Sequence, residues 1–365
     1  MNKDEVFINY ILNSRIRKQP PANVNDVYQL YADKYKKWIS PFLNRHGIEE
    51  VPQLLLFNTL QKTPDFFIID NNSFFVIDYS IHRYFYDINY IFSNSEFIEY
   101  IVNAYIKLYM EKAYLAERID FCYCLCVNMP DIEDFKRTNS YRNEDTIRDL
   151  YEKTDLQEMF LLLHEASHSL FYTFDKTVRE SEGFQVLKDN LQPIIKINKT
   201  ININDEFYEE CYCDYKSIFY ILEETYFLTK LSYDEYFSLF FLTLINVYII
   251  QYFERCQNES INLHDDFENN QITLFSMRMA NLHTTLYNFL SAHKQNTEII
   301  NKLELVYNAS LEKLADVLTK AHQISQHLED IFSNSISEYE HLTKKDKINY
   351  IENYLLLVNM NVSIS

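Results

Sequence analysis

The order of apolar and polar residues divides the chain into a mixed N-terminal part and a helical remainder. Through the first fifty residues, apolar positions recur at helical spacing up to a break at Gly47. Three short runs of strand character follow, VPQLLLF, DFFIID and FFVIDYS, and the stretch Asn71–Ser73 between the last two is typical of a hairpin turn. Residues 95–118 return to helical spacing, and Asp120–Met129 (DFCYCLCVNM) is predicted to form a further strand.

After residue 150 the pattern predicts helices and almost no strands. Thr154 and Asp155 precede the apolar segment LQEMFLLLHEASHSLFYTF, and Asp155 with Glu158 has the Asp-x-x-Glu form of a helix start. The segment Met129–Asp149 is rich in charged residues and asparagine, which predicts a long surface loop. Later helices are expected at about residues 205–230, 232–256, 270–296, 299–334 and 343–358.

Composition and charge exclude several classes of function. Only two glycines occur, Gly47 and Gly183, so the chain cannot build a Walker or dinucleotide loop around a phosphate. The formal charge is −19 without a compensating run of Lys and Arg, which argues against a nucleic-acid partner.

Residues 1–20 interrupt any apolar stretch with acids and amides, so no export signal is expected. The longest apolar run, Tyr236–Ile250, is shorter than a bilayer demands and predicts a buried helix, with a membrane-associated protein as a weaker alternative.

The six cysteines are interpreted as free thiols of a cytoplasmic protein. The two-residue spacings of Cys122, Cys124 and Cys126, and of Cys211 and Cys213, favour no local disulfide. A Cys-x-Cys-x-Cys run can bind a soft metal, but its alternation with apolar residues is more typical of one packed face of a strand.

The segment LLLHEASHSLF, residues 161–171, carries the most specific chemical signal. Residues four apart on a helix face the same way, so His164 and His168 can reach one ion. Two imidazoles supply two of the three protein ligands of an open zinc site, and Glu165 beside the first can act as general base toward a bound water. The motif therefore predicts metal-assisted hydrolysis of an amide bond.

A buried core helix with satisfied histidines is the alternative interpretation of this segment. The apolar residues Phe160–Leu163 before the motif, and the small Ala166 and Ser167 within it, indicate a largely buried helix. Unpaired polar groups in such a helix cost several kcal/mol each. Two histidines and a glutamate together therefore favour a metal site.

A second segment, residues 204–217 (NDEFYEECYCDYKS), offers the third ligand. Glu210 and Asp214 are four residues apart and share one helical face. Glu210 is the favoured ligand, because Cys211 and Cys213 indicate a buried helix, and Asp214 is expected to accept the second ring N–H of a ligating histidine. Four other carboxylates compete for the ligand role: Glu206, Glu209, Glu223 and Glu224.

The two motifs together resemble those of a known family of metallopeptidases. The pattern His164-Glu165-x-x-His168, followed about forty residues later by Glu210-x-x-x-Asp214, resembles the gluzincin metallopeptidases, in which a second helix supplies a glutamate ligand with an aspartate behind it. Over about residues 120–285 the chain resembles the Lit-type phage-exclusion peptidases and, more loosely, the ImmA/IrrE-like peptidases. The resemblance implies a cytoplasmic zinc endopeptidase that acts on one or few protein targets in phage defence or regulatory switching.

The same resemblance suggests where a peptide would be bound and polarised. Relatives often carry a His-Pro pair before an arginine in a later helix, whereas this chain has Arg278 within FSMRMANLH and lacks the pair. Arg278 or His283 is the candidate to stabilise the oxyanion, with an ordinary exposed helix position as the alternative for each. Zincin peptidases commonly bind substrate as an extra strand on a sheet edge, and Asp120–Met129 is the candidate edge.

Taken together, these features predict an α+β fold that is predominantly helical. It should have a zincin-like core, a small antiparallel sheet in the N-terminal half and a helical C-terminal half. Three consecutive parts are expected: residues 1–150 with the sheet, 151–285 with the catalytic zinc, and 286–365 for recognition of an activating or inhibitory protein partner. The expected substrate is a protein, with neither nucleic acid nor an integral membrane segment involved. The alternative function is a non-catalytic helical interaction protein with a structural metal or none.

Overall fold

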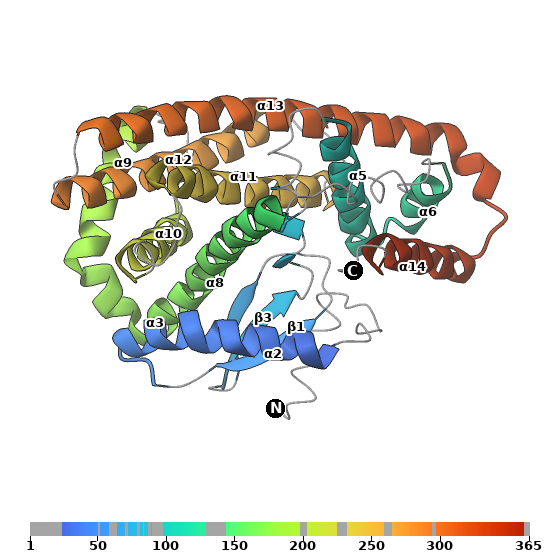
Figure 1. Cartoon of the computed structure of the whole chain (residues 1–365). Helices are drawn as coiled ribbons and strands as arrows, with labels where there is room; N and C mark the ends of the chain where they lie inside the picture. The colour runs from blue at the N-terminus through green and yellow to red at the C-terminus, as the bar shows by residue number, and fades with distance from the viewer. Residues whose placement is uncertain are drawn as a thin grey trace. The chain divides into compact units, whose positions relative to one another are not determined.

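The computed structural model shows a predominantly helical protein with one small sheet (Figure 1). The described helices are α2 (Val24–Lys34), η1 (Tyr35–Ile39), α3 (Ser40–Arg45), α5 (Ile98–Leu115), α6 (Ile119–Asn128), α8 (Glu144–Glu180), α9 (Glu182–Ile197), α10 (Asp205–Glu224), α11 (Tyr233–Asn258), α12 (Asp265–Ala292), α13 (Thr297–Ser335), η4 (Ile336–Tyr339) and α14 (Lys344–Met360). The structure describes residues 24–49, 52–57, 64–69, 72–78, 81–82, 84–86, 89, 98–128, 144–197, 203–224, 232–258, 265–293 and 297–360.

Most of the helices expected from the sequence are confirmed. The segment predicted at residues 95–118 contains α5, and the five later segments correspond to α10 to α14 over their described residues. The N-terminal helices end before Gly47, which adopts a left-handed backbone with φ of 75° that favours glycine. The amphipathic pattern therefore predicted these helices correctly, whereas α9 was not anticipated and α6 was predicted as a strand.

The chain divides into two compact units, each assembled from three separate segments. The first unit contains Met1–Phe85, Glu152–Asn246 and Leu263–Glu312. The second unit contains Tyr86–Tyr151, Val247–Asn262 and Lys313–Ser365. These units do not coincide with the three consecutive parts expected from the sequence. All residues of the predicted metal site lie in the first unit.

The small sheet of the first unit is mixed rather than antiparallel. It contains β1 (Gln53–Phe57), β2 (Asp65–Ile69) and β3 (Asn72–Asp78) in the order β1-β3-β2. β2 and β3 form the expected antiparallel hairpin, with Ile69 opposite Asn72, so Asn72 belongs to the strand rather than to the turn. β1 runs parallel to β3, so the prediction of a wholly antiparallel sheet was wrong.

The burial of β3 explains this arrangement. Four consecutive residues, from Phe74 to Ile77, are almost completely buried, although neighbouring side chains of a strand point to opposite faces. A continuous apolar run of this kind is typical of a central strand with both faces covered. On one face, Phe75 lies edge-on to Tyr35 of η1, and Phe66 of β2 meets Tyr172 of α8 at a ring distance of 5.8 Å. The motif helix therefore packs against the sheet through the edge strand β2.

The predicted strand Asp120–Met129 is instead the helix α6 of the second unit. Most of its apolar residues are buried, including Phe121, Leu125 and the three cysteines. Short apolar runs are compatible with a buried strand and a buried helix alike, and the spacing of polar residues in this run could not separate them. The prediction that this segment is an edge strand for substrate was therefore wrong. All six cysteines are free and buried, as expected.

Helix α8 begins earlier than the sequence indicated. It starts at Glu144, so Asp155 does not cap it, and the predicted loop Met129–Asp149 overlaps its first residues. Residues 129–143 of that loop lie outside the described part of the chain. The helix is kinked at Phe174, whose backbone has φ of −136° and ψ of 32°. The long helix thus carries the metal motif on its central turns and changes direction just after it.

Helix α11 contains the longest apolar run and is largely buried. Among the described helices, Tyr233–Phe253 is long and apolar enough to cross a membrane, but 83% of its most apolar window is buried within the protein. The expectation of a buried helix is confirmed.

The Asp-x-x-Glu pattern serves a buried charge cluster rather than a helix cap. Lys34 donates to Asp155 Oδ1 at 3.0 Å and also to the fully buried Glu158. His82 Nδ1 lies 3.0 Å from Glu158 Oε2. Burial alone would raise the pKa of Glu158, but the positive charge of Lys34 and the contact with His82 lower it to about 2. This cluster ties α2 to the motif helix.

Replacement of Glu158 should therefore cost stability in a pH-dependent manner. The folded pKa of about 2 lies below the ordinary 4.5, so the contribution is complete above pH 4.5 and is lost as the pH falls from 4.5 toward 2. Glu158→Gln is expected to lower the free energy of unfolding at neutral pH by about 3 kcal/mol, measured by urea denaturation.

A matched control on the same helix is the exposed Glu180, which lies 3.9 Å from the ammonium group of Lys176. Glu180→Gln should have almost no effect on unfolding. A difference between wild type and Glu158→Gln that stays constant down to pH 3 would contradict the assignment of the buried ion pair.

Candidate metal centre

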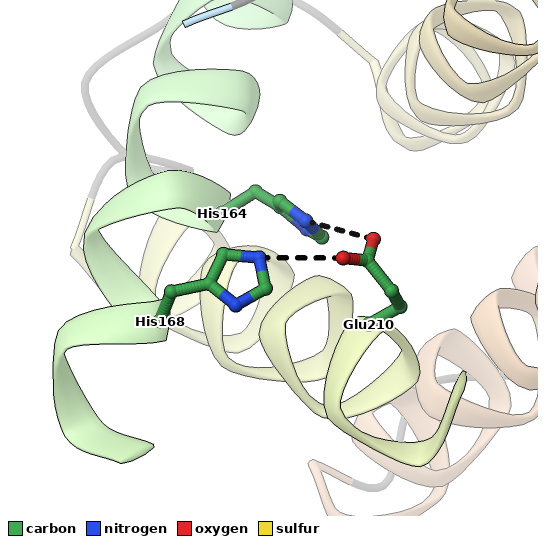
Figure 2. Close-up of side chains that lie close together, drawn as sticks. All are labelled: His164, His168 and Glu210. Atoms are coloured by element: carbon green, nitrogen blue, oxygen red, sulfur yellow. Dashed lines mark ion pairs between the residues drawn. The ribbon is translucent and has the colours of Figure 1, made fainter. Parts of the chain in front are cut away.

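Three side chains from two helices converge in the first unit. His164 and His168 lie one turn apart on α8, and Glu210 lies on α10. Glu210 Oε2 lies 3.3 Å from His164 Nε2, and Glu210 Oε1 lies 3.4 Å from His168 Nε2. Figure 2 shows both imidazole rings directed toward the single carboxylate. These three groups form a cluster whose ligand-type atoms all lie within 4.8 Å of one another.

The opposite nitrogen of each imidazole is held by its own carboxylate. His164 Nδ1 lies 2.9 Å from Asp214 Oδ1, and His168 Nδ1 lies 3.0 Å from Glu209 Oε1. A ring that donates its Nδ1–H to a carboxylate keeps a lone pair on Nε2. The outer partners therefore select the tautomer in which both Nε2 atoms can bind a cation.

Local sequence explains why this polar cluster can exist in a buried helix pair. The residues between the histidines are the small Ala166 and Ser167, and Ser167 donates its hydroxyl to Leu163 O at 2.7 Å, which satisfies it within the helix. On α10, Cys211 and Cys213 are completely buried on either side of Tyr212. The polar groups of the site are thus flanked by buried residues of α10.

Arg278 of α12 completes the charge arrangement behind the site. Its guanidinium donates to both oxygens of Asp214, with Nη2 2.9 Å from Oδ1, and its Nη1 lies 3.0 Å from Glu210 Oε2. Burial would raise the pKa of both carboxyls, but the Arg278 charge lowers the pKa of Asp214 and holds that of Glu210 well below its usual range. Both carboxyls are therefore ionised at neutral pH.

The surrounding acids raise the pKa values of both histidines. Burial by itself lowers the pKa of His164, yet the Asp214 carboxylate outweighs burial and raises it. The pKa of His168 is raised as well: burial lowers it, and contacts with Cys213, Glu209 and Glu210 more than compensate. Burial raises the pKa of the Cys213 thiol to about 12, so this sulfur stays protonated beside His168. The cluster thus has the affinity for positive charge that a cation site requires.

The donor set fits zinc. Two imidazole nitrogens and one carboxylate oxygen are the protein ligands of many open zinc sites. With bonds of about 2.0–2.1 Å in a tetrahedron, neighbouring ligand atoms lie about 3.3–3.4 Å apart. The separations of 3.3 and 3.4 Å between the Nε2 atoms and the Glu210 oxygens match that edge length.

The residues predicted from sequence mostly lie at this site. The structure brings together His164, His168, Glu210 and Asp214, and it adds Arg278 as an ion-pair partner rather than an exposed residue. Glu165 lies between the histidines on α8 and is partly exposed. His283 has different neighbours, because its Nε2 lies 3.0 Å from Glu304 and its ring packs on Tyr307.

Two features escaped the sequence interpretation. Glu209 was only one of several competing ligands, but it holds His168 while Glu210 faces both Nε2 atoms. The second group of ligand-type atoms, from His82, Asp155 and Glu158, was not anticipated. The ammonium group of Lys34 lies among these three side chains and supplies positive charge there, so we assign that group a structural role.

Comparison of the chain with models of known protein families, with curated proteins and with solved structures found no match.

Proposed function

We propose that this protein is a zinc-dependent endopeptidase with a gluzincin-type site on a zincin-like core. The observation that carries the proposal is the convergence of two Nε2 atoms on the carboxylate of Glu210. The Nδ1 atom of each ring contacts a further, separate carboxylate. A helix whose histidines served only as core residues would not need two dedicated acids and a shared third one. This arrangement favours the metal site over the core-helix alternative.

The roles of the chain's own residues follow from their positions. His164, His168 and Glu210 would hold the ion, and Asp214 and Glu209 would orient the two imidazoles. A bound zinc ion supplies a Lewis acid that polarises the peptide carbonyl and lowers the pKa of a coordinated water. Glu165, partly exposed beside the buried His164, would accept the proton of the attacking water and deliver it to the leaving amine. Arg278, committed to Asp214 and Glu210, would position these two carboxylates.

Strand β2 is the proposed edge for an extended peptide. It is an outer strand of the sheet, and its Phe66 packs on Tyr172 of the motif helix. Tyr172 follows Glu165 by seven residues, two helical turns, so both lie on the same face of α8. A peptide added beside β2 would thus run along the face that carries the proposed base.

The family resemblance also suggests where the protein acts and on how many targets. An endopeptidase of this kind would act inside the cell on one or few protein targets, as a defence or regulatory effector restrained until a trigger arrives. The apolar helix α11, mostly buried, would belong to the core of a cytoplasmic protein rather than to a membrane.

A comparison of cellular protein termini tests the proposed activity. Cells that produce the wild-type chain should contain new protein N-termini, detected by terminal amine labelling and mass spectrometry. Cells that produce Glu165→Gln at the same level should lack these termini, because the variant keeps the metal ligands and loses the base. Identical sets of termini in both cultures would favour the non-catalytic interaction protein instead.

A further inference from the structure

The carboxylate of Glu209 joins the metal motif to the end of the motif helix. One oxygen, Oε1, lies 3.0 Å from His168 Nδ1. The other, Oε2, lies 3.4 Å from Nη2 of Arg179. Arg179 is on α8 itself, eleven residues after His168 and beyond the kink at Phe174. A single acid of α10 therefore connects two parts of α8 that the kink separates.

Arg179 is held in place by several further contacts. Its Nε donates to Oδ1 of Asp175, one turn earlier on α8. Its guanidinium lies over two aromatic rings, 5.3 Å from that of Phe171 on α8 and 6.0 Å from that of Phe184 on α9. The side chain is 29% exposed, so the group lies close to the surface while its planar head is fixed by packing.

We propose that Arg179 and Glu209 form a clamp that sets the metal affinity of the site and couples it to residues 175–180 of α8. The inference rests on the proposed zinc site. A carboxylate that accepts the second N–H of a ligating imidazole fixes the ring and increases its basicity, and its loss typically weakens metal binding by about 10–100-fold. Arg179 contacts the other oxygen of that carboxylate and so orients it, which makes Arg179 a positioning residue that acts through Glu209.

The coupling must run in both directions. If an ordered clamp strengthens zinc binding, zinc must stabilise the clamp by the same factor. Residues 175–180 should then exchange their amide hydrogens more slowly when zinc is bound, although none of them is a metal ligand. A partner protein or substrate that displaces this segment would weaken the site, which gives the proposed peptidase a means of control remote from the zinc itself.

Zinc affinities of matched variants test the clamp. Dissociation constants are measured by competition with a chelator for wild type, Arg179→Ala, Glu209→Ala and the double variant. Glu209→Ala should bind zinc about 10–100-fold more weakly, and Arg179→Ala should be weaker by a factor within that range. In the Glu209→Ala background, Arg179→Ala should have little further effect, because both changes remove one linked interaction. Arg179→Lys should recover part of the affinity.

The control is Arg45→Ala, which removes an arginine that pairs with Glu223 and Glu224 on the same helix α10. It should leave the zinc affinity unchanged. Thermal unfolding of the metal-free proteins, recorded in parallel, identifies a purely structural effect, which would lower the melting temperature without changing the dissociation constant.

The outcomes separate the clamp from the zinc site. Wild-type affinity in Arg179→Ala, or additive losses in the double variant, would overturn the clamp and leave the zinc site intact. Absence of zinc binding by the wild type would overturn both the clamp and the proposed function. Hydrogen exchange adds a second criterion: zinc should protect residues 175–180 in the wild type and should fail to do so in Glu209→Ala.

Discussion

Glu165→Gln is expected to retain zinc and to lose peptide hydrolysis by about 10²–10⁴-fold. The substitution preserves the size of the side chain and leaves His164, His168 and Glu210 unchanged, so the proposed ion-binding groups stay in place. It removes the carboxylate that would accept the proton of the attacking water, and an amide cannot take over that role. The rate falls because the chemical step loses its base, while metal binding is untouched.

The measurement uses a peptide that spans a cleavage site identified from the cellular termini. Values of kcat/KM are determined for wild type and Glu165→Gln, together with zinc content by mass spectrometry. Glu180→Gln, an exposed substitution on the same helix, serves as the control and should match the wild type. A Glu165→Gln variant that holds zinc and cleaves at the wild-type rate would exclude Glu165 as the base.

Arg278→Ala is expected to destabilise the metal-free protein by about 3–5 kcal/mol. The guanidinium is the cation that faces the fully buried Asp214, and it also pairs with Glu210. Its removal leaves the fully buried Asp214 and the partly exposed Glu210 without this positive partner, and an uncompensated buried charge costs far more than the pair itself contributes. The loss should appear in the free energy of unfolding, measured by urea in the presence of a chelator so that zinc binding does not contribute.

Arg45→Ala provides the contrast for this measurement. Arg45 also pairs with two glutamates of α10, but its side chain is 47% exposed, so its removal should cost about 0–1 kcal/mol. Excess zinc should restore part of the stability lost in Arg278→Ala, because a cation between Glu210 and the histidines offsets some of the uncompensated charge. Equal stabilities of Arg278→Ala and Arg45→Ala would show that Asp214 does not depend on the guanidinium.

The residues of the metal cluster could be predicted from sequence, because two of its pairs lie four residues apart on one helix. Helical spacing fixes His164 relative to His168, and Glu210 relative to Asp214, without knowledge of the rest of the fold. Only the meeting of the two helices required tertiary structure. Arg278 could be suspected from sequence, but its partners lie 64 and 68 positions earlier in the chain, so its ion pairs could not be derived.

Other parts of the fold could not be derived for definite physical reasons. The run DFCYCLCVNM is apolar at most positions, so its spacing fits a buried strand and a buried helix alike, and the tertiary structure decides between them. Asp155 and Glu158 resemble a helix start because caps and salt-bridge partners use the same side chains. The parallel pairing of β1 with β3 depends on which strand occupies the centre of the sheet, a choice made by packing on both faces.

The zinc anomalous signal of crystals grown with the metal tests the proposed site most directly. We expect one peak in the first unit, bonded to Nε2 of His164, Nε2 of His168 and a carboxylate oxygen of Glu210, with a further coordination position open to solvent. A crystal saturated with zinc that shows no peak among these three side chains, or a peak whose coordination is closed entirely by protein, would contradict it.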